Sequence, residues 1–210
     1  MIGLGRFGTY LAATLAQLGN EVLAIDRDAQ TVQRWSSRLD RVVQADATDE
    51  TALRQLAIGE YERAVVCIGA AVEASILTVL ALTEVGASSV WARATSGKHA
   101  RILSAIGARH VVFPEAETGE RVAHLIVSNM LDFIEFGDDF AIAKVRVPPP
   151  LVGRTLADVT PNARYGVMVV GAKRPGSRYE YATPDTVLTE GSLLIVEGGI
   201  DQVQRFAGLT

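Results

Sequence analysis

The sequence predicts an α/β protein: a Rossmann-like, doubly wound parallel sheet followed by a second, smaller α+β subdomain. Short β-branched runs alternate with helix-length amphipathic segments through the first two thirds of the chain. Near-continuous hydrophobic strands separated by helices are typical of a parallel sheet covered on both faces. A glycine motif at residues 3–8 opens the first helix, and after Phe113 the alternation gives way to strands and turns.

Apolar runs mark the strands expected in the first part. Residues at helical spacing, such as Leu11, Leu15 and Leu18, separate them. The expected strands are residues 21–26, 41–46, 64–68, 89–94 and 110–113. Only Met1 and Ile2 precede the first glycine, where a buried strand of about five residues is usual. We therefore expect the native chain to start upstream of Met1, since the centre of the sheet would otherwise be empty.

A helix is expected over residues 118–134. Its apolar stripe is too wide for one ordinary surface face; it comprises Val122, Ala123, Ile126, Val127, Met130, Leu131, Phe133 and Ile134. The helix either packs against its own domain or is a crossover or dimer helix, and the width of the stripe favours the second reading.

The sequence Gly137-Asp138-Asp139 then predicts a hinge into the second subdomain. Its expected strands are residues 141–147, 167–172 and 192–197, with a closing helix over residues 201–206. The predicted domains are residues 1–137 and 138–210.

Composition excludes several classes of protein. With 49% hydrophobic and 21% charged residues, the 210-residue chain has ordinary globular composition. A net charge of −4 argues against a broad nucleic-acid surface. The single cysteine, Cys67, excludes an internal disulfide and a cysteine-based zinc site. Because we find neither a signal peptide nor an apolar run of membrane-spanning length, we expect a cytoplasmic protein.

Residues 3–8, GLGRFG, match the GxGxxG pattern of dinucleotide sites. Gly3 permits a tight turn, Gly5 lets the backbone approach a phosphate, and Gly8 lets the helix pack on the strand. Asp26 ends the next strand, where a carboxylate accepts ribose hydroxyls and repels a 2′-phosphate, although Arg27 beside it softens that repulsion. In the alternative reading, the glycines only pack the helix.

A third segment, Asp46-Ala47-Thr48, ends the next strand, where the adenine should lie. Thr48 or Asp49 also suits the N-cap of the helix that follows. The two roles are compatible.

These residues, together with VLAID at 22–26, ADATD at 45–49, Ile68-Gly69, WARA at 91–94 and FPE at 113–115, resemble the RCK (regulator of potassium conductance) domain family. The resemblance covers essentially the whole chain as one TrkA-N-type and one TrkA-C-type unit, and it is closest to the KtrA type. It implies a cytosolic, ATP/ADP-sensing regulatory subunit, not an enzyme. Such a subunit gates a KtrB/TrkH-like membrane potassium uptake protein at the inner face of the cell membrane, as a homodimer that assembles into an octameric ring.

The resemblance also implies roles for individual residues. Arg6 would reach a γ-phosphate across the dimer, Arg93 would lie near the phosphates, and Glu115 would hold Mg²⁺, Ca²⁺ or Na⁺ between paired nucleotides. Read without the resemblance, Glu115 is a solvated acid or a helix cap. The implied nucleotide-binding residues are Gly3, Gly5, Arg6, Phe7, Gly8, Asp26, Arg27, Asp46, Ala47, Thr48, Ile68, Gly69 and Arg93. Arg164 and Pro184 resemble a cyclic di-AMP site of the second subdomain, although a solvated turn explains Arg164 equally well.

Two other functions stay open. The first is an NAD(H)-binding redox sensor or dehydrogenase-like protein, and the second is the gating domain of a potassium channel or efflux protein. Against an enzyme, the chain has no Tyr-x-x-x-Lys pair and no P-loop, and His99, His110 and His124 form no catalytic pattern. Cys67 lies in an apolar strand and is expected in the core.

Overall fold

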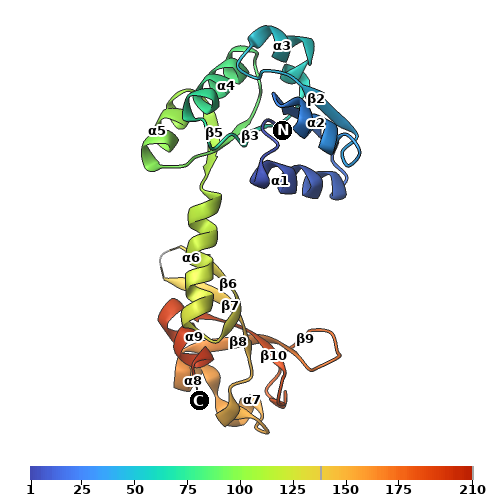
Figure 1. Cartoon of the computed structure of the whole chain (residues 1–210). Helices are drawn as coiled ribbons and strands as arrows, with labels where there is room; N and C mark the ends of the chain where they lie inside the picture. The colour runs from blue at the N-terminus through green and yellow to red at the C-terminus, as the bar shows by residue number, and fades with distance from the viewer. Residues whose placement is uncertain (138, 210) are drawn as a thin grey trace. The chain divides into compact units, whose positions relative to one another are not determined.

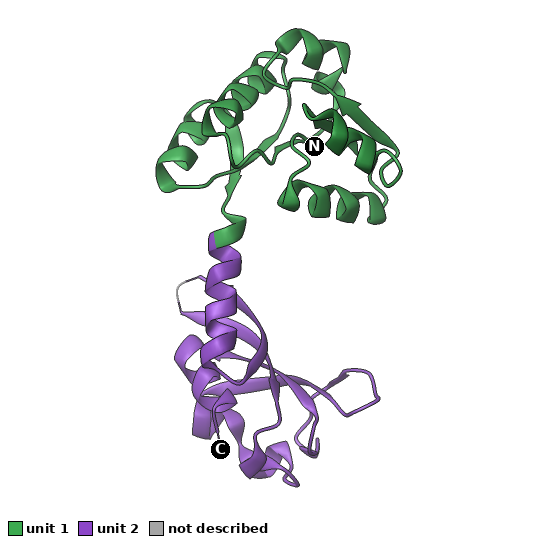
Figure 2. Ribbon diagram, viewed as in Figure 1, with its two compact units in different colours: residues 1–115 green, residues 116–210 purple. Residues whose placement is uncertain are grey.

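The computed structural model describes residues 1–137 and 139–209 (Figure 1). It divides into two compact units, Met1–Glu115 and Ala116–Thr210 (Figure 2). The sequence places the domain boundary at residue 137 instead, and Asp138 itself lies outside the described residues. None of the helices in the described part of the chain is long and apolar enough to cross a bilayer.

The first unit is built on parallel strands: β1 (Leu23–Asp26), β2 (Arg41–Gln44), β3 (Ala64–Val66), β4 (Val90–Arg93) and β5 (Ala108–Val112). β1 pairs with β2, while β3, β4 and β5 form a second ladder. Ile2 joins the two by bridging Ile25 on one side and Val66 on the other. The resulting order, β2-β1-Ile2-β3-β4-β5, confirms the predicted doubly wound fold. The centre of the sheet is filled by Ile2, which is 3% exposed.

Helices cover both faces of this sheet. They are α1 (Arg6–Gln17), α2 (Ala29–Trp35), α3 (Glu50–Gln55), the short 3-10 helix η1 (Ile58–Glu60), α4 (Val72–Glu84) and α5 (Gly97–Ala105). Neighbouring residues of β1 point to opposite faces: Ala24 packs in a cluster with Ala12 of α1, whereas Ile25 packs in a cluster with Leu53 of α3 and Leu82 of α4. Side chains of Asp28, Asp49 and Ser96 cap α2, α3 and α5.

The second unit contains a five-stranded antiparallel sheet in the order β6-β7-β10-β8-β9. The strands are β6 (Met130–Phe136), β7 (Phe140–Arg146), β8 (Val167–Lys173), β9 (Glu180–Tyr181) and β10 (Leu193–Gly199). Its helices are α6 (Pro114–Val127), whose first two residues belong to the first unit, η2 (Pro149–Leu151), α7 (Leu156–Val159), α8 (Pro161–Tyr165) and α9 (Ile200–Ala207). Phe206 of α9 is fully buried in the core of this unit. The strands and closing helix expected here are confirmed.

The single helix expected over residues 118–134 is wrong in its second half. α6 ends at Val127, and Met130–Phe136 forms strand β6. A bulge in the pairing of β6 with β7 lies between Met130 and Asp132. Met130 and Phe133, three residues apart, are therefore both buried, and this spacing imitates one face of a helix.

Gly137 connects β6 to β7 with φ 70°, a conformation that suits glycine. Phe136 pairs with Phe140 across this connection. The expected hinge therefore lies between two strands of one sheet, because β6 and β7 are hydrogen-bonded to each other.

Candidate nucleotide site

The glycine motif forms a tight loop between the bridging residue Ile2 and α1. Gly3 has φ 91°, and a Cβ added at Gly8 would overlap the Gly3 carbonyl oxygen. A Cβ on Gly5, by contrast, would meet nothing within 4 Å. Gly3 and Gly8 therefore shape the loop, while Gly5 leaves its outer side open to a ligand.

The first turn of α1 offers unpaired donors. Gly5 is the N-cap and supplies no side-chain cap, and the first turn has no acidic residue. The first bond of the helix runs from Thr9 N–H to Gly5 O, at 3.0 Å. Within the described part of the chain, no hydrogen bond is found for the backbone N–H groups of Gly5, Arg6, Phe7 and Gly8. Unpaired donors at the positive end of a helix dipole are groups that can bind an anion.

Asp26, at the end of β1, holds the glycine loop through a hydrogen bond. Its Oδ2 accepts a hydrogen bond from Leu4 N–H at 2.7 Å, and its Oδ1 accepts one from Asp28 N–H at 2.9 Å. Each carboxylate oxygen keeps a further lone pair for a ligand hydroxyl. The acid predicted to hold ribose fixes the glycine loop in this structure, a contact that spacing alone did not indicate.

The segment after β3 forms the other wall of the site. A Cβ on Gly3 would lie 3.2 Å from Ile68 Cγ1 and 3.3 Å from Ile68 N, so the glycine loop packs against this segment. Ile68 therefore lies beside the loop, and its role in nucleotide binding, like that of Gly69, stays a prediction. This place, outside the carboxyl ends of the strands where the strand order reverses, is where open α/β sheets bind ligands.

Arg93, at the end of β4, reaches across the same segment. A Cβ added at Gly69 would overlap its guanidinium group. Arg93 Nε donates to Glu115 Oε2 at 3.2 Å, and its second terminal nitrogen donates to Oε1. The ion pair joins a largely covered arginine, 20% exposed, to an accessible glutamate, 63% exposed. Two residues predicted for separate ligands are in this structure bound to each other.

Asp46, Ala47 and Thr48 follow β2. Asp46 Oδ1 accepts from Thr48 N–H at 3.0 Å and from Thr48 Oγ1 at 2.8 Å, and these bonds lower the pKa of Asp46, with a smaller contribution from Arg27. Asp49, rather than Thr48, caps α3. The segment is a hydrogen-bonded turn in which the side chain of Ala47 is buried.

Glu115 by itself is an incomplete cation site. In the described residues, no group of three or more His, Cys, Asp or Glu side chains converges. An oxygen-bound cation at Glu115 would take six or more ligands and would need donors from phosphates, water or another chain. The carboxylate suits such an ion chemically, but Arg93 occupies it here.

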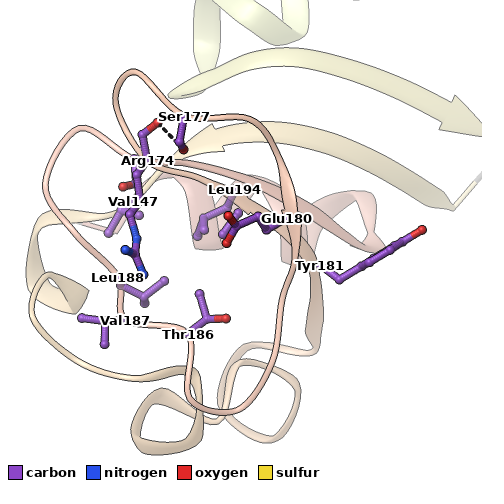
Figure 3. A pocket seen from close by; sticks show the side chains of 11 residues that line it. Val147, Arg174, Ser177, Glu180, Tyr181, Thr186, Val187, Leu188 and Leu194 are labelled. Carbon is purple, nitrogen blue, oxygen red and sulfur yellow. Dashed lines mark hydrogen bonds between the residues drawn. The ribbon is translucent and has the colours of Figure 1, made fainter.

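Two surface cavities of the second unit bear on the predicted second ligand site. One, of about 110 Å³, is lined by Arg174, Glu180 and Leu188 among others (Figure 3). It is smaller than the roughly 300 Å³ at which ligand pockets usually begin. The other, of about 340 Å³, is lined largely by apolar groups and includes Pro184. Arg164, predicted beside it, is exposed on α8 and does not line this cavity, whereas Asn162 of the same helix does.

The fold and the loop define a nucleotide-binding protein of the Rossmann type. Residues 1–114 match the family model of the TrkA-N domain, and residues 140–209 match that of the TrkA-C domain. The chain therefore belongs to the TrkA-N/TrkA-C family of RCK-domain proteins. Residues 115–139 lie between the two matches.

Close relatives match nearly the whole chain. It is 35% identical over 207 residues to Ktr system potassium uptake protein C of Bacillus subtilis (strain 168), covering 98% of this chain and 94% of the relative. It is also 35% identical over 204 residues to Ktr system potassium uptake protein A of Vibrio alginolyticus, covering 97% and 93%.

Solved structures share the fold. The GsuK channel bound to NAD aligns with 98% of this chain at a TM-score of 0.67 and 19% identity, and the chain spans 38% of that protein. GsuK bound to ADP aligns with 61% of this chain at a TM-score of 0.54 and 15% identity, and the chain spans 34% of it. At these identities the likeness concerns the fold.

Proposed function

We propose that this protein is a non-enzymatic regulatory subunit that binds an adenine nucleotide in its first unit and thereby controls a membrane potassium transporter. The observation that carries the proposal is the unpaired N–H cluster of residues 5–8, braced by Asp26 at a sheet switch point. A nucleotide supplies both an anion for this cluster and a ribose for the carboxylate. The adenine would lie against the turn of Asp46, Ala47 and Thr48.

Discrimination between ATP and ADP is assigned to Arg6. Arg6 is exposed at the start of α1, and none of the ion pairs found in the described residues includes it. Its planar fork suits a terminal phosphate. A γ-phosphate bound by Arg6 across a dimer, with a cation (Mg²⁺, Ca²⁺ or Na⁺) at Glu115, would favour one dimer geometry. ADP would not, because a ligand shifts an equilibrium only by its differential affinity.

The proposed partners are a second copy of this chain and a KtrB/TrkH-like transporter at the inner face of the cell membrane. The names of the relatives support a role in potassium uptake. Exposed apolar side chains on α6, namely Val122 at 44%, Ile126 at 77% and Val127 at 78%, support a homodimer. Assembly of dimers into an octameric ring completes the proposal.

Cyclic di-AMP is proposed as a second ligand. The 340 Å³ cavity that includes Pro184 and Asn162 is within the size range of ligand pockets and has mostly apolar walls. Arg164, on the same helix as Asn162, would contribute a positive charge to the site.

Calorimetry with ATP, ADP, NAD and NADH tests the main proposal, using the wild type and Arg6→Ala, with and without Mg²⁺. We expect the variant to lose ATP affinity selectively, by roughly tenfold, the order expected for a charge-assisted phosphate contact. Its ADP affinity should change little. Equal loss of ATP and ADP affinity would contradict the assigned role of Arg6.

The same experiment addresses the second candidate, an NAD(H)-dependent redox sensor. Asp26 suits the unphosphorylated ribose of NAD(H), and a fold neighbour is described as bound to NAD. Tight NADH binding together with indifference to ATP and to Arg6 would favour this candidate.

A further inference from the structure

The cavity of about 110 Å³ in the second unit brings two opposite charges together without pairing them. Arg174 and Glu180 both line it, and Figure 3 shows the guanidinium group and the carboxylate directed into it from different sides. None of the ion pairs found among the described residues includes either side chain. Two unpaired charges of opposite sign that face one cavity suit a ligand that carries both an anionic and a cationic group.

The hairpin of β8 and β9 positions the two charges. Ala172 of β8 pairs with Glu180 of β9, and Arg174 lies two positions after Ala172, so strand alternation directs both to the cavity. A turn fixes the backbone of Arg174, because its carbonyl oxygen accepts from Ser177 N–H at 3.1 Å and from Ser177 Oγ at 3.0 Å. Gly176 in this turn has φ 77°, a conformation that suits glycine.

The neighbouring positive charge faces elsewhere. Lys173, between Ala172 and Arg174, does not line the cavity, and its Nζ lies 5.7 Å from the ring centroid of Tyr179. Adjacent side chains of a strand point to opposite sides. Lys173 therefore provides a matched control for Arg174, with the same charge on the other side of the hairpin.

The floor of the cavity is apolar, and the volume limits the ligand. Leu188 and Leu194 are 1% and 0% exposed, and the buried hydroxyl of Ser192 is paired with Thr189 Oγ1 at 2.6 Å. At roughly 30 Å³ per water, the cavity holds on the order of four waters. A nucleotide does not fit this space, whereas a molecule of the size of alanine does.

We propose that this cavity binds a small α-amino acid in its zwitterionic form. Arg174 donates to the carboxylate of the amino acid, Glu180 accepts from its ammonium group, and its short side chain packs against Leu188 and Leu194. The site goes beyond the proposed nucleotide function because it lies in the second unit. It also shares no lining residue with the cavity that includes Pro184. The second unit thus binds a metabolite of a different chemical class.

Amide resonances of the ¹⁵N-labelled full chain, followed during titration with L-alanine, test the site. We expect saturable shifts at Leu188, Ser192 and Leu194 with a dissociation constant of about 1 mM, which is attainable for a ligand of about six non-hydrogen atoms. Propionate and ethylamine each keep one of the two charges and should bind at least roughly tenfold more weakly. Absence of saturable shifts with L-alanine up to roughly 50 mM would overturn the proposal. Binding of propionate as tight as that of L-alanine would overturn it too.

Variants of the three charged residues assign the contacts. Arg174→Gln should weaken L-alanine binding about tenfold, the order expected for the loss of a hydrogen bond to a charged group, whereas Lys173→Gln should change it little. Glu180→Gln should remove the preference for L-alanine over propionate, because propionate has no ammonium group. Arg174 and Glu180 are exposed, so these variants keep the fold. Equal losses in Arg174→Gln and Lys173→Gln would show a general electrostatic effect and contradict the site.

Discussion

Gly5 and Gly8 belong to one motif but have different physical roles. Gly8 is buried so close to the Gly3 carbonyl oxygen that no side chain fits there. Gly5 has open space around its Cα and a φ of −72°, which any residue can adopt. One glycine therefore supports the fold, and the other keeps the site accessible.

This difference gives a matched pair of variants. Gly8→Ala should cost about 1–3 kcal/mol of unfolding free energy, because the loop must move to admit the methyl group. Gly5→Ala should cost less than about 1 kcal/mol, as a change of N-cap, yet lower nucleotide affinity at least tenfold, about 1.4 kcal/mol. Denaturant unfolding and calorimetry measure the two effects. A Gly5→Ala variant that binds normally would place the phosphates elsewhere.

Cys67 lies under the glycine loop in an apolar environment. A Cβ on Gly8 would be 3.1 Å from Cys67 Cβ, and the Cys67 thiol is 3.4 Å from Met1 Sδ. Burial raises the pKa of the thiol from 9 to about 11. The expectation that Cys67 is a core residue is confirmed.

The raised pKa predicts an alkaline loss of stability. The folded chain keeps the thiol protonated, whereas the unfolded chain ionises it from about pH 9, so this contribution is complete below pH 9 and is lost as the pH rises toward 11. We expect Cys67 to account for about 1 kcal/mol of the decline by pH 10. Unfolding free energies of the wild type and Cys67→Ala between pH 7.5 and 10.5 test this. Identical pH slopes in the two proteins would show that the thiol titrates normally.

Among the elements, β1 to β5 were predictable and β6 was not. The first five are short apolar runs between helices, and their pattern is local. β6 contains a bulge, which places Met130 and Phe133 on the buried side at helical spacing. The spacing of apolar residues alone cannot distinguish a bulged strand from one face of a helix, since the bulge depends on pairing with β7.

The candidate site likewise contains features that the sequence predicts and contacts that it does not. The glycine loop and Asp26 follow from a sequence motif whose geometry is fixed by a turn and a strand end. The Arg93–Glu115 ion pair joins residues 22 positions apart. The close approach of the Arg93 guanidinium to Gly69 depends on how two parallel strands align. Neither contact has a sequence pattern, because each depends on how segments far apart in the chain pack against each other.

The strand assignment of residues 130–136 predicts unequal costs for two neighbouring side chains. Phe133→Ala should lower the unfolding free energy by about 3–5 kcal/mol, because Phe133 is 5% exposed and stacks on His124 with ring centroids 4.8 Å apart. Leu131→Ala should cost under about 1 kcal/mol, because Leu131 is 39% exposed. Chemical denaturation of both variants provides the comparison. Equal costs would favour the helical reading of this segment.

At the scale of the whole molecule, α6 carries apolar side chains that the fold of a single chain leaves exposed. None of its side chains is buried, and Ile126 and Val127 are more than three quarters exposed. Apolar side chains gathered on one exposed element mark an interaction surface. The proposed homodimer would cover them.

Replacing Ile126 by Lys should therefore shift the protein toward monomer, by at least tenfold in the dimer dissociation constant, because a charge would be placed in an apolar interface. Sedimentation velocity over a concentration series gives this constant. Lys98, exposed on α5, provides the control: Lys98→Glu should leave assembly unchanged. Unaltered association of Ile126→Lys would exclude this face from the dimer.

The central claim is that a nucleotide binds at the N-terminus of α1 in the first unit. Backbone amide resonances of the ¹⁵N-labelled protein, followed during titration with ADP, test it most directly. We predict the largest shifts, and new protection from hydrogen exchange, at Gly5, Arg6, Phe7 and Gly8, whose N–H groups are unpaired within the described structure. Saturable binding of ADP that leaves these four amides unchanged would contradict the account.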